Sequence, residues 1–230
     1  KKTPDPDDVQ RPRLWIDRSF SIKGAGTVVT GTLTGGSLEI DDELEIWPLK
    51  EKVRVRGIQA HHLEQSKISP GSRCALNIAG VSHGEISRGN VLIKSGEWHL
   101  TKMLDASLQV LDEIDHNVSR KGAFIAYFGS GEYPVKLRVL GPNPILPGGK
   151  EPIRIFLPEA LPLLPGDRFI LRESGRDETI GGGEVLDVDP QEKASKAKPD
   201  RSIERIIKER GWINTEELKL LTGENIEPDI

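Results

Sequence analysis

The sequence predicts a mainly β protein built from two small β-barrels in tandem, followed by two short helices. The 24 glycines and 16 prolines lie among short Val/Ile/Leu segments, a distribution that favours brief strands joined by tight turns. Several of these segments alternate apolar and polar residues, as the wall of a barrel with one solvated face does. With 230 residues, the chain is long enough for about two domains that each bury a core.

Residues 13–98 are predicted to form the first barrel. Turn signals such as Gly35-Gly36 and Pro70-Gly71 separate its strands. The expected strands are residues 14–16, 27–32, 43–47, 53–58, 74–78 and 90–93.

Residues 99–189 are predicted to form the second barrel. The proline-rich segments 142–144 and 147–149 are expected to be irregular connections between its strands. The expected strands are residues 103–110, 121–128, 135–140, 152–157, 167–172 and 183–188.

Three segments are expected to lie outside the barrels. Residues 1–12 are charged, contain proline and lack periodicity, which predicts a linker from an absent upstream part. Residues 190–200 have no apolar stripe and are expected to be a hinge. Residues 201–230 are expected to begin a third domain that is cut short, because two short helices are too little for a stable core.

The two helices are predicted from spacing and capping residues. Ile203, Ile206 and Ile207 recur at helical spacing, and Gly211 is placed to end that helix. A second helix is expected from Thr215, capped by Thr215 itself or by Asn214.

Composition limits the function classes. The formal charge of -4 gives no reason to expect nucleic-acid binding from bulk charge, so an RNA site would have to be a local patch. The single cysteine, Cys74, excludes an internal disulfide and a cysteine-rich metal site, and its apolar surroundings predict a core residue. No run approaches the roughly 20 apolar residues of a membrane span, and a cytoplasmic protein without a membrane partner is expected.

No catalytic residue and no metal site can be nominated from the residues. The run 24–31 is rich in glycine but lacks the spacing of a phosphate-binding loop and leads into a strand. The glycines 181–183 are expected to form a turn or bulge. His61 and His62 are expected to face opposite sides of a strand, and the other three histidines lack ligand partners at useful spacing. The chain therefore has the character of a binding module.

Two stretches resemble domain two of translational GTPases of the elongation-factor Tu superfamily. Residues 16–32, IDRSFSIKGAGTVVTGT, resemble the opening of that domain, and residues 85–92, EISRGNVL, resemble its closing signature. Further details resemble the selenocysteine-specific branch more than the general elongator: Lys23, residues 54–59 with His61 after them, residues 71–80, residues 165–172 and residues 179–187. A winged helix after domain three is also peculiar to that branch.

The resemblance implies two elongation-factor-type barrels followed by a truncated winged-helix start. It implies that domain two holds the aminoacyl end of a tRNA. Asp17, Arg18 and Arg73 match the positions that line the selenocysteine pocket, where two guanidinium groups favour the anionic selenol over the neutral hydroxyl of serine.

Four further residues take roles from the resemblance. Gln59 aligns with the residue that packs against the terminal adenosine, and Arg88 with the arginine at the 5′ end of the tRNA. His61 is a further tRNA-binding candidate, and Lys23 is expected to face the absent GTPase domain. One departure stands out: Tyr127-Phe128-Gly129-Ser130 replaces a His-x-Gly-Thr pattern, which puts any contact through that histidine in doubt.

The implied partners are selenocysteinyl-tRNA, the ribosome and, through absent winged helices, the selenocysteine-insertion hairpin of the mRNA. GTP and Mg would be bound by the absent GTPase domain, so the fragment is not expected to hold a cofactor or to be an enzyme, and a monomer is the default.

Two alternatives remain open. Another translational or sulfate-activating GTPase of the same superfamily would share the barrels, and a small enzyme with an unrecognised site is a second possibility. Without the family match, Asp17 and Arg18 would form a surface ion pair and Arg73 would be a solvated turn residue.

Overall fold

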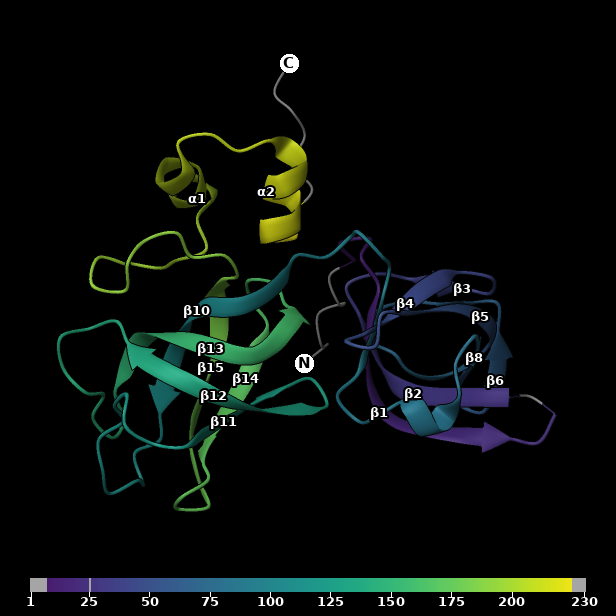
Figure 1. Ribbon diagram of the computed structural model, residues 1–230, viewed down its shortest axis with the longest axis horizontal. Coiled ribbons are helices and arrows are strands. Elements are labelled where there is room, and N and C mark those ends of the chain that lie inside the picture. The colour runs from purple at the N-terminus through teal and green to yellow at the C-terminus, as the bar shows by residue number, and fades with distance from the viewer. Residues whose placement is uncertain (1–7, 25, 225–230) are drawn as a thin grey trace, which may run out of the picture. The chain divides into compact units, whose positions relative to one another are not determined.

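The computed structural model describes residues 8–24 and 26–224 (Figure 1). The chain divides into two compact units: residues 1–98 with 129–131, and residues 99–128 with 132–230. Residues 1–7 of the predicted linker, Ala25, and residues 225–230 of the predicted winged-helix start lie outside the described residues. Neither described helix is long and apolar enough to cross a membrane.

The first unit contains a closed barrel, as predicted. Its strands follow the order β4-β9-β1-β2-β8-β5, and the pairing of β4 with β5 closes the ring. Strand β6 pairs with β5 outside the ring, and β3 pairs with β7 in a separate two-stranded sheet. The elements are β1 (Arg13–Ile22), β2 (Gly26–Thr34), β3 (Leu38–Glu39), β4 (Glu43–Trp47), β5 (Glu51–Ala60), β6 (Leu63–Gln65), β7 (Lys67–Ile68), β8 (Arg73–Ala79), the 3-10 helix η1 (His83–Glu85) and β9 (Val91–Ile93).

Alternation of side chains builds the core of this barrel. On β8, Cys74, Leu76 and Ile78 are buried, whereas Arg73 is exposed. Burial raises the pKa of the Cys74 thiol to about 11, so the thiol remains neutral at physiological pH. The prediction that Cys74 is a core residue is therefore confirmed.

The second unit contains a second closed barrel, in the order β10-β13-β12-β11-β14-β15. Its strands are β10 (Leu100–Val110), β11 (Phe124–Phe128), β12 (Gly131–Val139), β13 (Lys150–Pro162), β14 (Arg168–Glu173) and β15 (Glu178–Asp187). The mainly β fold class with two six-stranded barrels is thus confirmed.

The glycines 181–183 lie inside β15, so the prediction of a turn there is wrong. The register of β15 against β14 does shift between Thr179 and Gly181, which is the irregularity of a β-bulge directly before the glycines. Gly181, Gly182 and Gly183 pair with β14 on one side and with β10 on the other. A Cβ atom at Gly183 would lie only 1.7 Å from the carbonyl oxygen of Ser107 on β10. The glycines are needed because the neighbouring backbone approaches too closely for a side chain.

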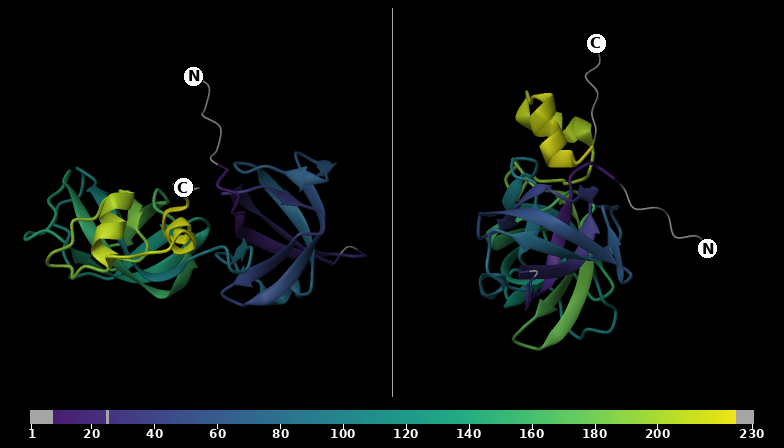
Figure 2. Two further views of the ribbon diagram at one scale, coloured as in Figure 1. Left: turned by 90° about the horizontal axis from the view of Figure 1, so that it is seen from above. Right: turned by 90° about the vertical axis from the view of Figure 1, so that its right-hand side faces the viewer.

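Two helices follow the second barrel and lie beside each other in both figures: α1 (Ile203–Arg210) and α2 (Thr215–Thr222) (Figures 1 and 2). Ser202 caps α1 and Asn214 caps α2, each accepting a backbone hydrogen bond on its side chain. Gly211 follows α1 with a positive φ of 74°, as the predicted helix stop requires.

A row of buried charges connects α1 to the outer face of the second barrel. Arg154 on β13 donates from Nε and Nη2 to the two carboxylate oxygens of Asp105 on β10, at 2.6 and 2.8 Å. Asp187 on β15, the cross-strand neighbour of Asp105, accepts from Nη1 of Arg205 on α1 at 2.9 Å. Asp105, Arg154 and Asp187 are all buried, so each of these charges depends on its partner.

We predict that Arg154→Ala will destabilise the second barrel by about 3–5 kcal/mol, because the buried Asp105 carboxyl, whose pKa burial already raises, would lose its bidentate partner. The measurement is hydrogen exchange at the amides of β10 and β13. Glu216→Ala breaks the exposed Glu216–Lys219 pair and serves as the control, with an expected cost of about 1 kcal/mol or less.

The double variant Asp105→Leu/Arg154→Met replaces both charges by apolar groups and should recover much of the loss. A loss for Arg154→Ala no larger than that for Glu216→Ala would show that the buried pair does not stabilise the barrel.

Candidate functional site

An irregularity in β1 places two predicted site residues on the outer face of the first barrel. Ile16 pairs with Gly31 and Arg18 pairs with Thr30, so Asp17 is an extra residue without a partner on β2. This is the geometry of a β-bulge. Ile16 faces the core, whereas Asp17 is partly exposed and Arg18 is exposed. The bulge therefore lets two successive polar residues lie outside the core.

Asp17 joins three strands through its two carboxylate oxygens. Thr30 on β2 donates from Oγ1 to Oδ1 of Asp17 at 2.6 Å. Arg73, the first residue of β8, donates from Nη1 to Oδ2 and forms an ion pair with Asp17. The Asp17 side chain is 18% exposed and that of Arg73 is 58% exposed. The carboxylate is thus held at both oxygens, while much of the guanidinium still faces solvent.

The pKa of Asp17 reflects a competition between burial and its partners. Burial alone would raise the pKa of the carboxyl group. The hydrogen bonds from Arg73 and Thr30, together with the positive charges of Arg73 and Arg18, outweigh that effect and lower the pKa below its ordinary value. Asp17 is therefore ionised at neutral pH and balances one of the two nearby arginine charges.

Gln59 lies on the same outer face. Thr30 pairs with Ala75 on β8, and Ala75 pairs with Gln59 on β5, so a single cross-strand row runs from Arg18 to Gln59. Three strand spacings separate the ends of this row, or about 14 Å. The structure therefore brings Asp17, Arg18, Arg73 and Gln59 together on one face.

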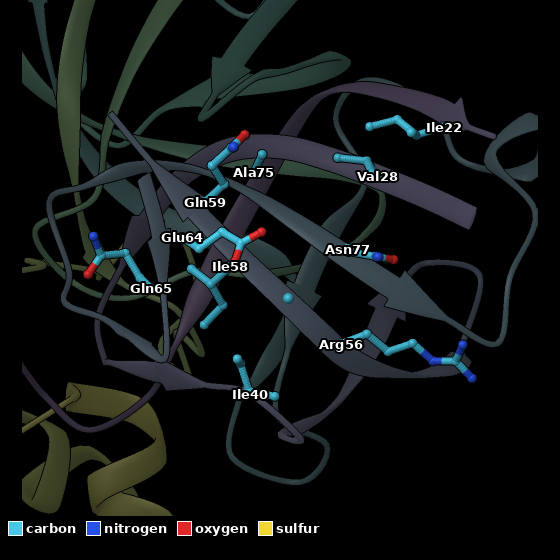
Figure 3. Close-up of a pocket in the computed structure, with 11 residues that line it drawn as sticks. Ile22, Val28, Ile40, Arg56, Ile58, Gln59, Glu64, Gln65, Ala75 and Asn77 are labelled. Atoms are coloured by element: carbon cyan, nitrogen blue, oxygen red, sulfur yellow. The ribbon is translucent and has the colours of Figure 1, made fainter. Parts of the chain in front are cut away.

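A pocket of about 350 Å³ opens beside this row (Figure 3). Gly57 and Ala75, which carry little or no side chain, leave room for it on the outer face. Gln59 and its cross-strand partner Glu64 supply polar groups, and Arg56 supplies a positive charge. The apolar part of the lining consists of Ile22, Val28, Ile40 and Ile58. The combination of apolar walls with a few polar groups is typical of a small-molecule or nucleotide subsite.

His61 and His62 do not lie on a strand, so the prediction that they face opposite sides of one is wrong. They are the two residues between the paired Ala60 and Leu63, where β5 turns into β6. Their φ angles are 51° and 65°, as the tight two-residue turn of a hairpin requires. His61 is exposed and is not part of the pocket lining.

Lys23 and Arg88 belong to segments outside the cross-strand row from Arg18 to Gln59, and Arg88 donates from Nε to the carbonyl oxygen of Ser130 at 2.9 Å. Lys23 is exposed in the turn between β1 and β2, and Arg88 is exposed in the segment that precedes β9. Neither contributes to the lining of the pocket. Among residues 8–24 and 26–224, no group of three or more His, Cys, Asp or Glu side chains could hold a metal ion.

Sequence reasoning missed three contributors to the site. Thr30 anchors Asp17, Glu64 faces Gln59 across β5 and β6, and Gly57 provides space for the pocket. Strict alternation with the buried Val29 would have placed Thr30 outside the core. The contact with Asp17 depends on the bulge, which no local sequence signal marks.

Comparison with known proteins identifies both barrels. Residues 26–93 match the family model "Elongation factor Tu domain 2", and residues 134–192 match the β-barrel domain of selenocysteine-specific elongation factor. The chain is 32% identical over 174 residues to the selenocysteine-specific elongation factor of Desulfomicrobium baculatum, covering 76% of this chain and 27% of that protein. The corresponding protein of Haemophilus influenzae is 33% identical over 183 residues, covering 79% and 29%.

Solved structures share the fold. Elongation factor SelB from Methanococcus maripaludis in its apo form gives a TM-score of 0.66 at 23% identity and covers 81% of this chain and 44% of that one. A bacterial selenocysteine-specific elongation factor, EF-Sec, gives a TM-score of 0.74 at 24% identity, and the match covers 96% of this chain and 37% of that one.

The chain spans 27% and 29% of the length of the two curated relatives that it matches.

We predict that Thr30→Val will raise the pKa of Asp17, because the carboxylate loses a hydrogen bond that favours its charged form. Thr30→Ser keeps the hydroxyl and should leave the pKa low. The measurement is a pH titration of the carboxyl carbon signal of Asp17. Because the folded pKa is lowered, the stability gained from this ionised group is present above the unfolded pKa and is lost as the pH falls through the folded value. An unchanged pKa in Thr30→Val would contradict the role given to Thr30.

Proposed function

Because the two barrels belong to the family of selenocysteine-specific elongation factors, we propose that this chain is the part of such a factor that holds selenocysteinyl-tRNA. The longer factor would deliver this tRNA to the ribosome at recoded UGA codons in a GTP-dependent manner. The observation that carries the proposal is the ion pair between Asp17 and Arg73. This pair lies beside Arg18, on the same face of the barrel as the pocket at Gln59.

The charges of the cluster suit an anionic aminoacyl group. Arg18 and Arg73 contribute two positive charges and Asp17 contributes one negative charge, which leaves one positive charge without a partner in the cluster. A selenolate would supply the missing negative charge and accept charge-assisted hydrogen bonds from the guanidinium groups. The exposed part of Arg73 is the part available for this contact, because Asp17 occupies only one side of the guanidinium.

Serine would be rejected because its hydroxyl is neutral. When a seryl group enters, the bound RNA covers the arginines without supplying an anion, and an unpaired, partly desolvated charge costs on the order of a few kcal/mol. A difference of that size can support discrimination of about 100-fold. Asp17 orients Arg73 and remains ionised because its pKa is lowered.

The pocket beside the cluster would accept the terminal adenosine of the tRNA. Its volume of about 350 Å³ lies within the range typical of ligand sites. Gln59 and Glu64 offer hydrogen-bonding groups to a base edge, and the apolar walls offer surface for its faces. The row from Arg18 to Gln59 then allows one aminoacyl-adenosine to reach both subsites.

The remaining contacts follow from the family. Arg88 would contact the 5′ end of the tRNA, His61 would be a further RNA contact, and Lys23 would face the GTPase domain. That domain, outside this chain, would bind GTP and Mg, so this part of the factor catalyses no reaction itself. We further propose residues 13–98 and 99–189 as domains two and three, residues 201–230 as the start of a winged-helix domain that leads to mRNA recognition, and a cytoplasmic monomer.

A second candidate is the same pair of domains in another GTPase of the superfamily. This second candidate is supported by the match of residues 26–93 to the family model "Elongation factor Tu domain 2", because that description is not specific to selenocysteine. The two candidates differ in one measurable property: only the first requires a preference for selenocysteinyl-tRNA over seryl-tRNA.

We predict that Arg73→Ala in the full-length factor with GTP will reduce the preference for selenocysteinyl-tRNA over seryl-tRNA by roughly 10- to 100-fold, because the selenolate loses a charge-assisted partner. Binding of both tRNAs is measured at several salt concentrations. Arg54→Ala, which removes an exposed arginine on β5 outside the pocket lining, is the charge-matched control. If the wild-type factor binds both tRNAs equally, the selenocysteine-specific proposal is wrong.

We predict that Gly57→Val will weaken binding of both tRNAs to a similar extent. A Cβ atom at Gly57 would meet only the Cβ of Asn77, at 3.7 Å, so the barrel tolerates it while the added methyl groups fill the pocket. The preference for selenocysteine should persist, because the Asp17–Arg73 pair is untouched. Unchanged affinity for both tRNAs would rule out the pocket as the adenosine subsite.

A further inference from the structure

The helices α1 and α2 contact the second barrel across the segment that the sequence predicts to be a hinge. Residues 190–200 form neither a helix nor a strand. The helices nevertheless belong to the same compact unit as the barrel. Because a connecting segment acts as a hinge only if few contacts cross it, the side chains that join the helices to the barrel decide whether this segment can bend.

Arg205 on α1 connects three segments through one guanidinium group. Its Nη1 atom forms ion pairs at 2.9 Å with Asp187 at the end of β15 and with Glu209 one turn further along α1. Its Nε atom donates to Oδ1 of Asp200 at 3.0 Å, and its Nη2 atom donates to the backbone oxygen of Asp200 at 2.9 Å. Only 12% of the Arg205 side chain and 3% of the Asp187 side chain are exposed. The contact between α1 and β15 is therefore a largely buried ion pair.

The partners of Arg205 stabilise its charge. Burial would lower the pKa of its guanidinium, but the hydrogen bond to Glu209 and the charge and hydrogen bond of Asp187 outweigh burial and raise the pKa. Asp187 lies opposite the buried Asp105 in the register of β15 and β10. Loss of Arg205 would leave Asp187 in a buried position without this partner, and removal of one member of a buried pair is strongly unfavourable.

Arg210, the last residue of α1, forms a second connection. Its Nη2 atom donates to the backbone oxygen of Asp189 at 2.6 Å and to Oδ2 of the same residue at 3.0 Å. Asp189 follows shortly after the end of β15. The spacing of Arg205 and Arg210 along α1 places the two connections about 7.5 Å apart along the helix axis. Two connections at different points of one helix restrain both its position and its direction.

The end of α2 also lies close to the barrel. A Cβ atom at Gly223, which follows α2, would lie 3.0 Å from Cδ1 of Leu164 in the segment between β13 and β14. A Cβ atom at Gly166 in the same segment would lie 3.2 Å from Nη2 of Arg201. The two glycines therefore leave room for the close approach of the helical segment to the barrel.

We propose that Arg205 and Arg210 form a latch that fixes α1 and α2 to the second barrel as one rigid body. Residues 190–200 then connect the barrel to the helices without acting as a hinge. An exposed ion pair contributes little and would open easily, whereas a buried one opens only at the cost of an unpaired charge.

The latch fixes the direction in which α2 leads away from the barrel. If α1 and α2 begin a winged-helix domain, as proposed above, that domain turns together with the second barrel. The latch itself lies wholly in the second unit and does not involve Asp17, Arg18 or Arg73. It can therefore fail without affecting the proposed function, and the proposed function can fail without affecting the latch.

The first experiment measures the distance between two spin labels by pulsed electron paramagnetic resonance. The labels are attached to cysteines introduced by Lys136→Cys on β12 and Glu217→Cys on α2, both exposed positions, while the native Cys74 is buried. We expect one narrow distance distribution for the otherwise unchanged chain. Arg205→Met should replace it by a broad distribution, because α1 loses its contact with β15. Lys208→Met, which removes an exposed charge from α1, should keep the narrow distribution.

The second experiment needs no label and compares the tumbling of the helices with that of the barrel by amide nitrogen relaxation. In the unchanged chain, the amides of α1 and α2 should report the same correlation time as those of the barrel strands, whereas in Arg205→Met they should tumble faster. Amide spectra establish that the barrel of each variant is folded.

The proposal is overturned if the unchanged chain gives a broad distance distribution, or if Arg205→Met alters neither the distances nor the tumbling. Equal effects of Arg205→Met and Lys208→Met would also overturn it, because they would reflect fraying of α1 and not the loss of a specific contact with β15.

Discussion

The β-bulge at Asp17 is the constraint on which the candidate site depends. A regular strand alternates sides at every residue, so Asp17 and Arg18 would face opposite directions and one of them would enter the core. The extra residue between Ile16 and Arg18 removes that conflict. It leaves Ile16 in the core and allows the Asp17 carboxylate to reach Thr30 and Arg73 on the two neighbouring strands. The cluster is thus a consequence of one irregularity in an otherwise regular barrel.

The two barrels use ion pairs in different ways. In the second barrel, Asp105 and Arg154 are buried and form two short hydrogen bonds, so neither side chain is free to take another partner. In the first barrel, Arg73 keeps more than half of its side-chain surface exposed while it is bound to Asp17. A buried pair stabilises only as long as both partners remain, whereas a half-exposed one can share its guanidinium with a ligand. The same chemical pair is therefore buried in the second barrel and half-exposed in the first.

Strand pairing decided the backbone conformation of two segments for which local composition predicts a different one. The run 181–183 has the composition of a turn, yet it occupies the middle of β15 because β10 and β14 leave no room for side chains. Conversely, His61 and His62 have the composition of neither a turn nor a strand end, and they form the tight turn between β5 and β6. In both cases the pairing of the flanking strands decided the backbone conformation, and local propensity was overridden.

The sequence by itself determined the two barrels, the end of α1 at Gly211 and Asn214 as one of two candidate caps of α2. These features follow from short-range properties: the alternation of apolar residues on β8, the conformational freedom of glycine and the capping oxygen of Asn214. The roles of Asp17, Arg18 and Arg73 come from the resemblance and stay a proposal. Only the tertiary structure decided that Thr30 holds Asp17, that Glu64 faces Gln59, and that Arg205 joins α1 to Asp187 on β15. Those relations join segments that are distant along the chain, and strand register, bulges and helix packing bring them together through contacts that no local pattern encodes.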